Sequence, residues 1–363
     1  MPPFRADHVG SLLRPGELLR ARADHAAGRI KRAELRRIED TAVARAVRMQ
    51  QDIGLQGVTD GEFRRHDWLM DFKFGIGGVE RVDAAAVKVP FRNESGAVDW
   101  SFVPYRIGGR LHHKGVIFGE DFTFLRSATK ATPKLTIPSP SMMHYPGGRG
   151  IDRAVYPDME QYFADLAQVY VDEIAALGKL GCTYLQMDDT SLAMLNDPAR
   201  RAAIGEGADT DHLRYIKLFN SVLRAKPPGM TICTHLCRGN FRSAWLAEGS
   251  YEHVAEAMFS ELAVDGFFLE YDDERSGDFA PLRFVPKGRR IVLGLVTTKK
   301  PALESKDDLK RRIDAAAKYM PLDQLCVSPQ CGFASTAEGN LLTLEDQIAK
   351  LRLVVEVARE VWG

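Results

Sequence analysis

The chain has 363 residues, of which 45% are hydrophobic, and its 49 basic side chains balance 49 acidic ones. A chain of this size and composition can bury a large core, either in one big domain or in two small ones. The even balance of charge argues against a general binder of nucleic acids, which would carry a basic excess.

Short apolar segments typical of buried strands alternate along the chain with helical stretches. The strands are expected around Val9 and at 56–59, 135–138, 183–187, 230–234, 266–269, 291–296 and 324–327. The main helices are expected at 33–53, 159–180, 212–225, 251–259, 306–319 and 344–361. Eight strands alternating with helices predict a (β/α)8 TIM barrel, an α/β fold, that spans residues 1–363 as a single domain.

One stretch, residues 77–130, breaks this rhythm with Gly, Pro and alternating Val and polar residues. The pattern predicts a β-rich insertion in the loop after the second strand. A small separate domain is the alternative, although the stretch is short for a core of its own.

No segment reaches the roughly 18 apolar residues of a membrane span, and the first residues lack the apolar core of a signal peptide. The five cysteines are odd in number and include no Cys-x-x-Cys pair, so a disulfide framework is not expected. We therefore expect a cytoplasmic protein with neither a membrane nor a nucleic-acid partner.

Four side chains with metal-binding atoms follow directly after predicted strands, and they are His235, Cys237, Glu270 and Cys331. Two thiolates, an imidazole and a carboxylate form a tetrahedral zinc set. The alternative is that the cysteines are small core hydrophobes and that the histidine is a satisfied core residue, because His-x-Cys alone is a weak signal. In a barrel, however, the carboxyl ends of the strands meet at one rim, so the fold predicts that these residues converge.

Other polar residues end predicted strands in the same way, namely Ser11, Asp60, Glu62, Ser139, Ser141, Asp188 and Asp189. Glu62 could instead be a solvated acid at a helix start, favoured by the helix dipole. Asp188 is expected to meet a ligand ammonium or an Arg, because burying an unpaired charge is costly.

Several motifs carry a family resemblance. They are Arg-Ala-Asp-His-Val-Gly-Ser at 5–11, Val-Thr-Asp-Gly-Glu-Phe-Arg-Arg at 58–65, Thr-Ile-Pro-Ser-Pro-Ser at 136–141, Leu-Gln-Met-Asp-Asp at 185–189, His-Leu-Cys-Arg-Gly-Asn-Phe-Arg-Ser at 235–243 and Ser-Pro-Gln-Cys-Gly-Phe-Ala-Ser at 328–335. With these motifs the chain resembles the catalytic carboxyl-terminal barrel of the cobalamin-independent methionine synthase family. It is most similar to the single-barrel bacterial branch of that family.

The resemblance implies roles for particular residues. His235, Cys237, Glu270 and Cys331 fall on the four zinc ligands of the family. Glu62 and Asp188 fall on the acids that hold the amino group of homocysteine, and the turn Val9, Gly10 and Ser11 falls on the loop that receives its carboxylate.

The chain departs from the family pattern in three places that concern the methyl donor. It has one barrel, whereas the full-length enzymes have a second barrel that helps to hold folate. The turn at 138–141 lacks the Trp that stacks on the pterin. Lys299 stands where the family has a catalytic histidine after strand seven. The expected donor is therefore a methyltetrahydrofolate-type compound, a corrinoid-bound methyl group or another activated methyl compound.

The sequence thus predicts a zinc-dependent thiol S-methyltransferase of methionine biosynthesis, with homocysteine as acceptor and Glu62, Asp188 and Lys299 as catalytic residues. Two alternatives remain at this point. One is a zinc-dependent alkyl transfer to another thiol, of the epoxide-opening type. The other is a non-catalytic zinc- or thiol-binding protein.

Overall fold

The computed structural model describes residues 1–205 and 207–363, and its centre is a seven-stranded parallel sheet. The strands follow the order β1-β6-β7-β8-β9-β10-β11 across the sheet. Their bounds are β1 Gly57–Val58, β6 Thr132–Pro138, β7 Tyr184–Asp189, β8 Thr231–Leu236, β9 Gly266–Glu270, β10 Arg290–Val296 and β11 Leu325–Pro329. Because the strands are parallel, all their carboxyl ends lie at the same edge of the sheet.

The segment around Val9 occupies the place of a strand between β11 and β1 without forming a regular ladder. Ala6 forms a single parallel bridge with Val327. Farther along, the carbonyl of Gly10 accepts a hydrogen bond from the Thr59 hydroxyl (2.6 Å), and the Leu12 amide donates to the Gly61 carbonyl (3.0 Å). The predicted first strand is thus reduced to an extended segment, because its backbone turns to meet the loop after β1.

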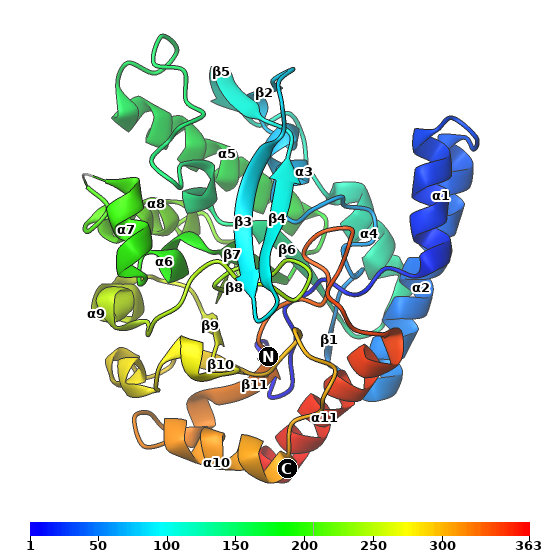
Figure 1. Ribbon diagram of the computed structural model, residues 1–363, viewed down its shortest axis with the longest axis vertical. Coiled ribbons are helices and arrows are strands. Elements are labelled where there is room, and N and C mark those ends of the chain that lie inside the picture. The colour runs from blue at the N-terminus through cyan, green and yellow to red at the C-terminus, as the bar shows by residue number, and fades with distance from the viewer. Residues whose placement is uncertain (206) are drawn as a thin grey trace.

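Helices surround the sheet, as Figure 1 shows. The long helices match the sequence pattern closely, whereas several shorter ones, including α1, were not predicted. The α-helices are α1 Gly16–Ala26, α2 Arg32–Ile53, α3 Met70–Gly75, α4 Gly119–Ala128, α5 Met159–Lys179, α6 Ser191–Met194, α7 Pro198–Ile204, α8 Asp211–Leu223, α9 Glu252–Glu261, α10 Lys306–Ala316 and α11 Leu344–Trp362. Short 3-10 helices are η1 Pro140–Met143, η2 Glu274–Ser276, η3 Ala280–Phe284 and η4 Leu322–Gln324.

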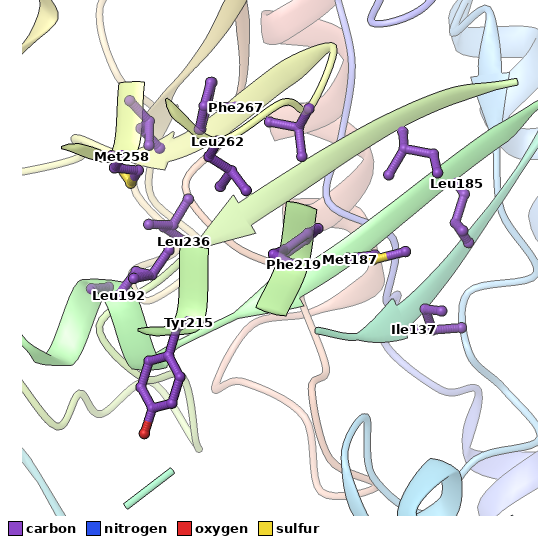
Figure 2. Packing of buried hydrophobic residues seen from close by; sticks show 14 of the residues in the cluster. Ile137, Leu185, Met187, Leu192, Tyr215, Phe219, Leu236, Met258, Leu262 and Phe267 are labelled. Carbon is purple, nitrogen blue, oxygen red and sulfur yellow. The ribbon is translucent and has the colours of Figure 1, made fainter. Parts of the chain in front are cut away.

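Alternation along the strands separates an outer core from an inner one. Outward residues such as Leu236 and Phe267 belong to one cluster with Phe219 of α8 and Met258 of α9 (Figure 2). A small second cluster combines inward residues of five strands with Val9, and it consists of Val9, Tyr184, Cys233, Phe268, Val292 and Cys326. Because strand side chains alternate with a period of two, the next inward positions toward the carboxyl ends include Gln186, His235 and Glu270.

The stretch predicted as a β-rich insertion contains four strands in two antiparallel pairs. Strand β2 (Gly77–Arg81) pairs with β5 (Tyr105–His112), and β3 (Val87–Asn93) pairs with β4 (Gly96–Phe102). Its last part is helical and forms α4. Figure 1 shows the β3–β4 hairpin lying across the front of the sheet, with its turn near β8 and its open end near α3 and β5.

Among the described residues, none of the helices is long and apolar enough to cross a membrane.

Candidate active site

A cavity of about 550 Å³ lies between the carboxyl ends of the strands and the β3–β4 hairpin. One wall carries His235, Cys237 and Cys331 together with Glu62 and Asp188. The volume falls in the range of roughly 300–1,000 Å³ that is usual for small-molecule sites.

Three of the four predicted metal ligands converge at this wall. One ligand atom each of His235, Cys237 and Cys331 lies within 4.8 Å of the others, and all three residues are buried. His235 points inward from the end of β8, Cys237 follows directly, and Cys331 comes two residues after β11. Neither ring nitrogen of His235 has a hydrogen-bond partner among residues 1–205 and 207–363.

The Cys331 thiol strongly affects the charge state of Cys237. The nearby Cys331 thiol and burial together raise the pKa of Cys237 well above its usual value. The buried imidazole of His235 is also unfavourable as it stands, because unsatisfied polar groups are expensive in a core. A metal ion that replaces the thiol protons would satisfy all three groups.

Glu270, the fourth predicted ligand, ends β9 but stands outside this group of mutually close atoms in the described part of the chain. Its Oε2 accepts a hydrogen bond from the backbone N–H of Arg238 at 2.6 Å. Its Oε1 lies 3.6 Å from both Lys299 Nζ and Arg275 Nη2. Burial alone would raise the pKa of Glu270, but Lys299, Arg238 and Arg275 hold it below the usual value, so the side chain is an anion.

Lys299 is buried behind Glu270 and does not belong to the lining of the cavity. Burial by itself would lower its pKa, but Glu270 and Asp272 raise the pKa above the usual value of a lysine. Lys299 is therefore a fixed cation that compensates Glu270.

Glu62 lies in the tight turn after β1, where its φ of 59° is unusual for a residue with a side chain. The Asp60 carboxylate accepts a hydrogen bond from the Glu62 amide (2.9 Å) and so holds the turn. Oε1 of Glu62 accepts a hydrogen bond from the Thr136 hydroxyl at 2.8 Å. Oε2 lies 3.7 Å from Arg65 Nη1 and has no hydrogen-bond partner within the described ranges. Glu62 is thus a buried residue at the cavity rather than a solvated helix-start acid.

Asp188 stands beside His235, because the two residues are partners in the register of β7 and β8. Its Oδ1 accepts a hydrogen bond from the Gln186 amide at 2.7 Å. Burial raises the pKa of Asp188 to about 7, with Glu62 adding to the rise and His235 opposing it. A cationic group bound here would favour the ionised form.

The turn of Val9, Gly10 and Ser11 borders the same wall. The Val9 carbonyl accepts a hydrogen bond from Gln186 at 2.7 Å. Gly10 has a φ of +146°, and a Cβ at this position would lie 2.7 Å from Thr136 Cγ2. The Ser11 hydroxyl lies so close to Gly332 that a Cβ there would come within 1.9 Å of Oγ. Glycine is therefore required at both positions for the turn to approach its neighbours.

Asp189 has a structural role that its position beside Asp188 did not reveal. Its two carboxylate oxygens accept four hydrogen bonds, from the hydroxyls of Ser139 (2.7 Å), Ser141 and Ser191 (2.7 Å) and from the Leu192 amide (2.9 Å). The carboxylate thereby ties η1 to the end of β7, and both segments border the cavity.

Comparison with known proteins decides the family. The family model described as "Cobalamin-independent synthase, Catalytic domain" matches residues 156–360. The Bacillus subtilis protein YxjH is 48% identical over 99% of this chain and 95% of its own length. The chain belongs to the cobalamin-independent methionine synthase family.

Other members of the family extend the comparison. A methionine synthase of Pyrococcus abyssi is 25% identical over 98% of this chain and 91% of its own. A crystal structure described as a putative vitamin B12-independent methionine synthase of Listeria monocytogenes has a TM-score of 0.77 and 37% identity, and the match covers 99% of this chain and 98% of that one. A B12-independent methionine synthase of a Shewanella species, solved in complex with selenomethionine, has a TM-score of 0.73 at 18% identity, covering 98% of this chain and 97% of the other.

These neighbours confirm the predicted α/β barrel class, and the family supports a methyltransferase. What the sequence missed is the aromatic part of the cavity. The turn at 138–141 indeed offers no Trp, but half-buried aromatic side chains from elsewhere line the cavity, and they are Trp68, Trp100, Phe102, Tyr105 and Tyr145. Three of them belong to the insertion, where the alternation of Trp100 and Phe102 on β4 was the available signal.

Proposed function

We propose that this chain is a zinc-dependent thiol S-methyltransferase that converts homocysteine into methionine. The observation that carries the proposal is the convergence of His235, Cys237 and Cys331 at a cavity wall that also holds Glu62 and Asp188. The family supports it, as does the selenomethionine complex of the Shewanella relative, since selenomethionine is the selenium analogue of the product.

The donor atoms fit zinc. Two sulfur atoms and one imidazole nitrogen, all buried, are typical zinc ligands, whereas magnesium and calcium prefer oxygen. Glu270 is the proposed fourth ligand, and its hydrogen bond to Arg238 places it beside the Cys237 loop. A bound zinc ion would act as a Lewis acid that lowers the pKa of a substrate thiol, so that the thiolate forms at neutral pH.

The remaining residues of the wall would orient the amino acid. The Glu62 Oε2 atom, which lacks a hydrogen-bond partner among the described residues, and the Asp188 carboxylate are suitable acceptors for the substrate ammonium. Binding of that ammonium would lower the pKa of Asp188 from about 7 and thereby fix the carboxylate as an anion. The Ser11 hydroxyl and its turn are proposed to receive the substrate carboxylate.

The methyl transfer is an in-line displacement. The bond between sulfur and the methyl carbon forms as the bond from the methyl carbon to its carrier breaks, and the electron pair of that bond leaves with the carrier. The thiol proton leaves the sulfur before attack. A folate carrier takes up a proton on its leaving nitrogen afterwards, whereas a sulfonium donor leaves as a neutral thioether and a corrinoid keeps the electron pair on its cobalt. The chain contributes mainly by holding the two reactants in line. Lys299, predicted as a catalytic residue, is better placed to stabilise the Glu270 anion than to deliver that proton.

The proposal is tested by methionine formation. Zinc-loaded protein is incubated with homocysteine in three separate reactions, each with one methyl donor: methyltetrahydrofolate, methylcobalamin or a trialkylsulfonium compound. Methionine in at least one reaction is expected. Absence of methionine in all of them, with homocysteine still bound, would favour the non-catalytic thiol-binding alternative.

A second measurement addresses the acceptor. Asp188→Asn should weaken the binding of homocysteine strongly, but it should leave the binding of a simple thiol without an amino group nearly unchanged. Equal effects on both thiols would contradict the assignment and would favour the epoxide-opening type of alkyl transfer.

A further inference from the structure

Lys73 is a buried cation on the wall of the cavity, and the proposed function assigns it no role. It lies in α3, its residue is only 2% exposed, and it borders the cavity. Its Nζ donates a hydrogen bond to the Tyr105 hydroxyl at 3.0 Å and lies 4.3 Å from the centroid of that ring. No carboxylate stands within 4.0 Å of Nζ in the part of the chain that the structure describes.

A buried lysine in this state is unusual. Lysine is almost never fully buried unless it is paired, and the ammonium has three donors, of which Tyr105 accepts one. The other buried lysines behave differently, because Lys134 pairs with Asp7 at 3.1 Å, Lys350 pairs with Glu304 at 3.2 Å and Lys299 faces Glu270. An anion from outside the chain would complete the surroundings of Lys73.

The charges around the cavity separate into two groups. The acids Glu62 and Asp188, where a substrate ammonium is proposed to bind, share a wall with His235, Cys237 and Cys331, the His/Cys group. Lys73 lies in α3 and the exposed Arg149 in the segment after η1. The other lysine and the other arginine that line the cavity have partners within the chain, because Lys88 lies 3.8 Å from Asp99 and Arg200 donates to the Leu246 carbonyl (2.8 Å). The second part of the cavity is therefore suited to a negatively charged ligand.

Aromatic faces lie beside this positive end. Trp100 and Phe102 project from the same side of β4 with ring centroids 5.0 Å apart, and both are half-buried and line the cavity. Trp68 and Tyr105 contribute two further faces. A ligand here would meet flat apolar surfaces together with a cation.

The β3–β4 hairpin, which carries Trp100 and Phe102, is fixed to the loop that follows Cys237. Arg92 and Trp245 exchange two backbone hydrogen bonds of 2.9 Å each, and Phe91 packs on Phe241 at 5.6 Å between centroids. A Cβ at Gly239, two residues after Cys237, would lie 3.0 Å from the Phe91 ring. The hairpin therefore reaches from the loop after β8 toward the region of α3, as Figure 1 shows, and residues of both its strands line the cavity.

We propose that Lys73 is a specificity-determining residue that binds an anionic group of the methyl donor. Tyr105 positions the Lys73 ammonium, and the carrier of the methyl group lies against the aromatic faces of β4. This inference rests on the proposed function, because it assigns the second substrate of the same site.

A direct binding measurement separates the role proposed for Lys73 from the proposed methyl transfer, since binding of the donor requires neither zinc nor turnover. The probe is 5-methyltetrahydrofolate with a single glutamate, and its dissociation constant is measured by isothermal titration calorimetry with the intact chain. Lys73→Met should raise the dissociation constant roughly tenfold or more, because it removes one partner of a buried charge pair. Lys73→Arg should restore most of the affinity, and the dissociation constant of homocysteine should not change.

Lys114→Met is the matched control, because Lys114 is exposed, donates a hydrogen bond to the carbonyl of Phe74 in α3 and does not line the cavity. It should bind the probe like the unmodified chain. Unchanged affinity in Lys73→Met, undetectable binding to the unmodified chain, or a loss confined to homocysteine would each overturn the inference. If the probe binds as expected but no donor yields methionine, then the proposed reaction fails while the assignment of Lys73 stands.

Discussion

Replacing Asp189 with Asn tests the idea that this carboxylate holds η1 against the end of β7 at the border of the cavity. The carboxylate accepts four hydrogen bonds, three from serine hydroxyls and one from the Leu192 amide. An amide keeps one oxygen and presents two N–H donors in place of the other, so two of the four donors lose their acceptor.

The expected loss of stability follows from these contacts. A buried donor without an acceptor costs about 1–3 kcal/mol, so two give roughly 2–6 kcal/mol. Serine hydroxyls can rotate and accept from the new amide, whereas the Leu192 amide cannot, so the Asn oxygen should stay with Ser191 and Leu192. With Ser139 and Ser141 rotated, the net loss should be about 2 kcal/mol in the free energy of unfolding.

The assay is urea unfolding at neutral pH, with the same dependence on urea required of both proteins. Asp209→Asn is the control, because Asp209 is highly exposed and makes one ion pair, with Arg201 at 3.0 Å, which contributes less than about 1 kcal/mol. If Asp189→Asn lost no more stability than this control, the reasoning would be refuted.

Two further predictions concern pH and steric fit. Burial, together with Arg214 and Arg153, lowers the pKa of His144 to about 4. The stability associated with its neutral form is therefore present above pH 6.5 and lost as the pH falls toward 4, and the loss between pH 7 and pH 5 should be roughly 2 kcal/mol. His144→Asn should reduce the fall in stability over this interval by that amount, and an identical pH profile would contradict the burial effect. Gly332→Ala should weaken homocysteine binding and lower stability by about 1–3 kcal/mol, because the added Cβ would meet the Ser11 hydroxyl. Gly16→Ala, which meets only the end of the Arg20 side chain at 3.4 Å, should leave homocysteine binding intact, and an equal loss in both variants would argue against the role of the Ser11 turn.

The convergence of the His/Cys group could be predicted from the sequence because it follows from strand periodicity and barrel geometry. His235 and Cys237 follow one buried strand and Cys331 another, and parallel strands bring their carboxyl ends together. The burial of Lys299 away from the cavity lining could not be predicted in this way, because it depends on the Glu270 anion, whose Oε1 lies 3.6 Å from Lys299 Nζ.

The aromatic wall was out of reach for a different reason. Alternation identifies β3 and β4 as strands, but only the contacts of Arg92 with Trp245 and of Phe91 with Phe241 fold the hairpin over the sheet. Such contacts join segments far apart in the sequence, and no local pattern encodes them. The first strand was overestimated for a related reason, since the backbone after Ala6 forms hydrogen bonds with the loop after β1 instead of continuing a ladder.

Zinc content is the measurement that bears most directly on the central claim. The purified chain should hold one equivalent of zinc, and Cys237→Ser and Cys331→Ser should each lose it. Cys182→Ser should retain it, because Cys182 is a buried thiol whose only side-chain hydrogen bond in the described structure is to the Tyr184 carbonyl. Full zinc occupancy in Cys237→Ser, or an unmodified chain that binds no zinc when it is supplied, would contradict the account.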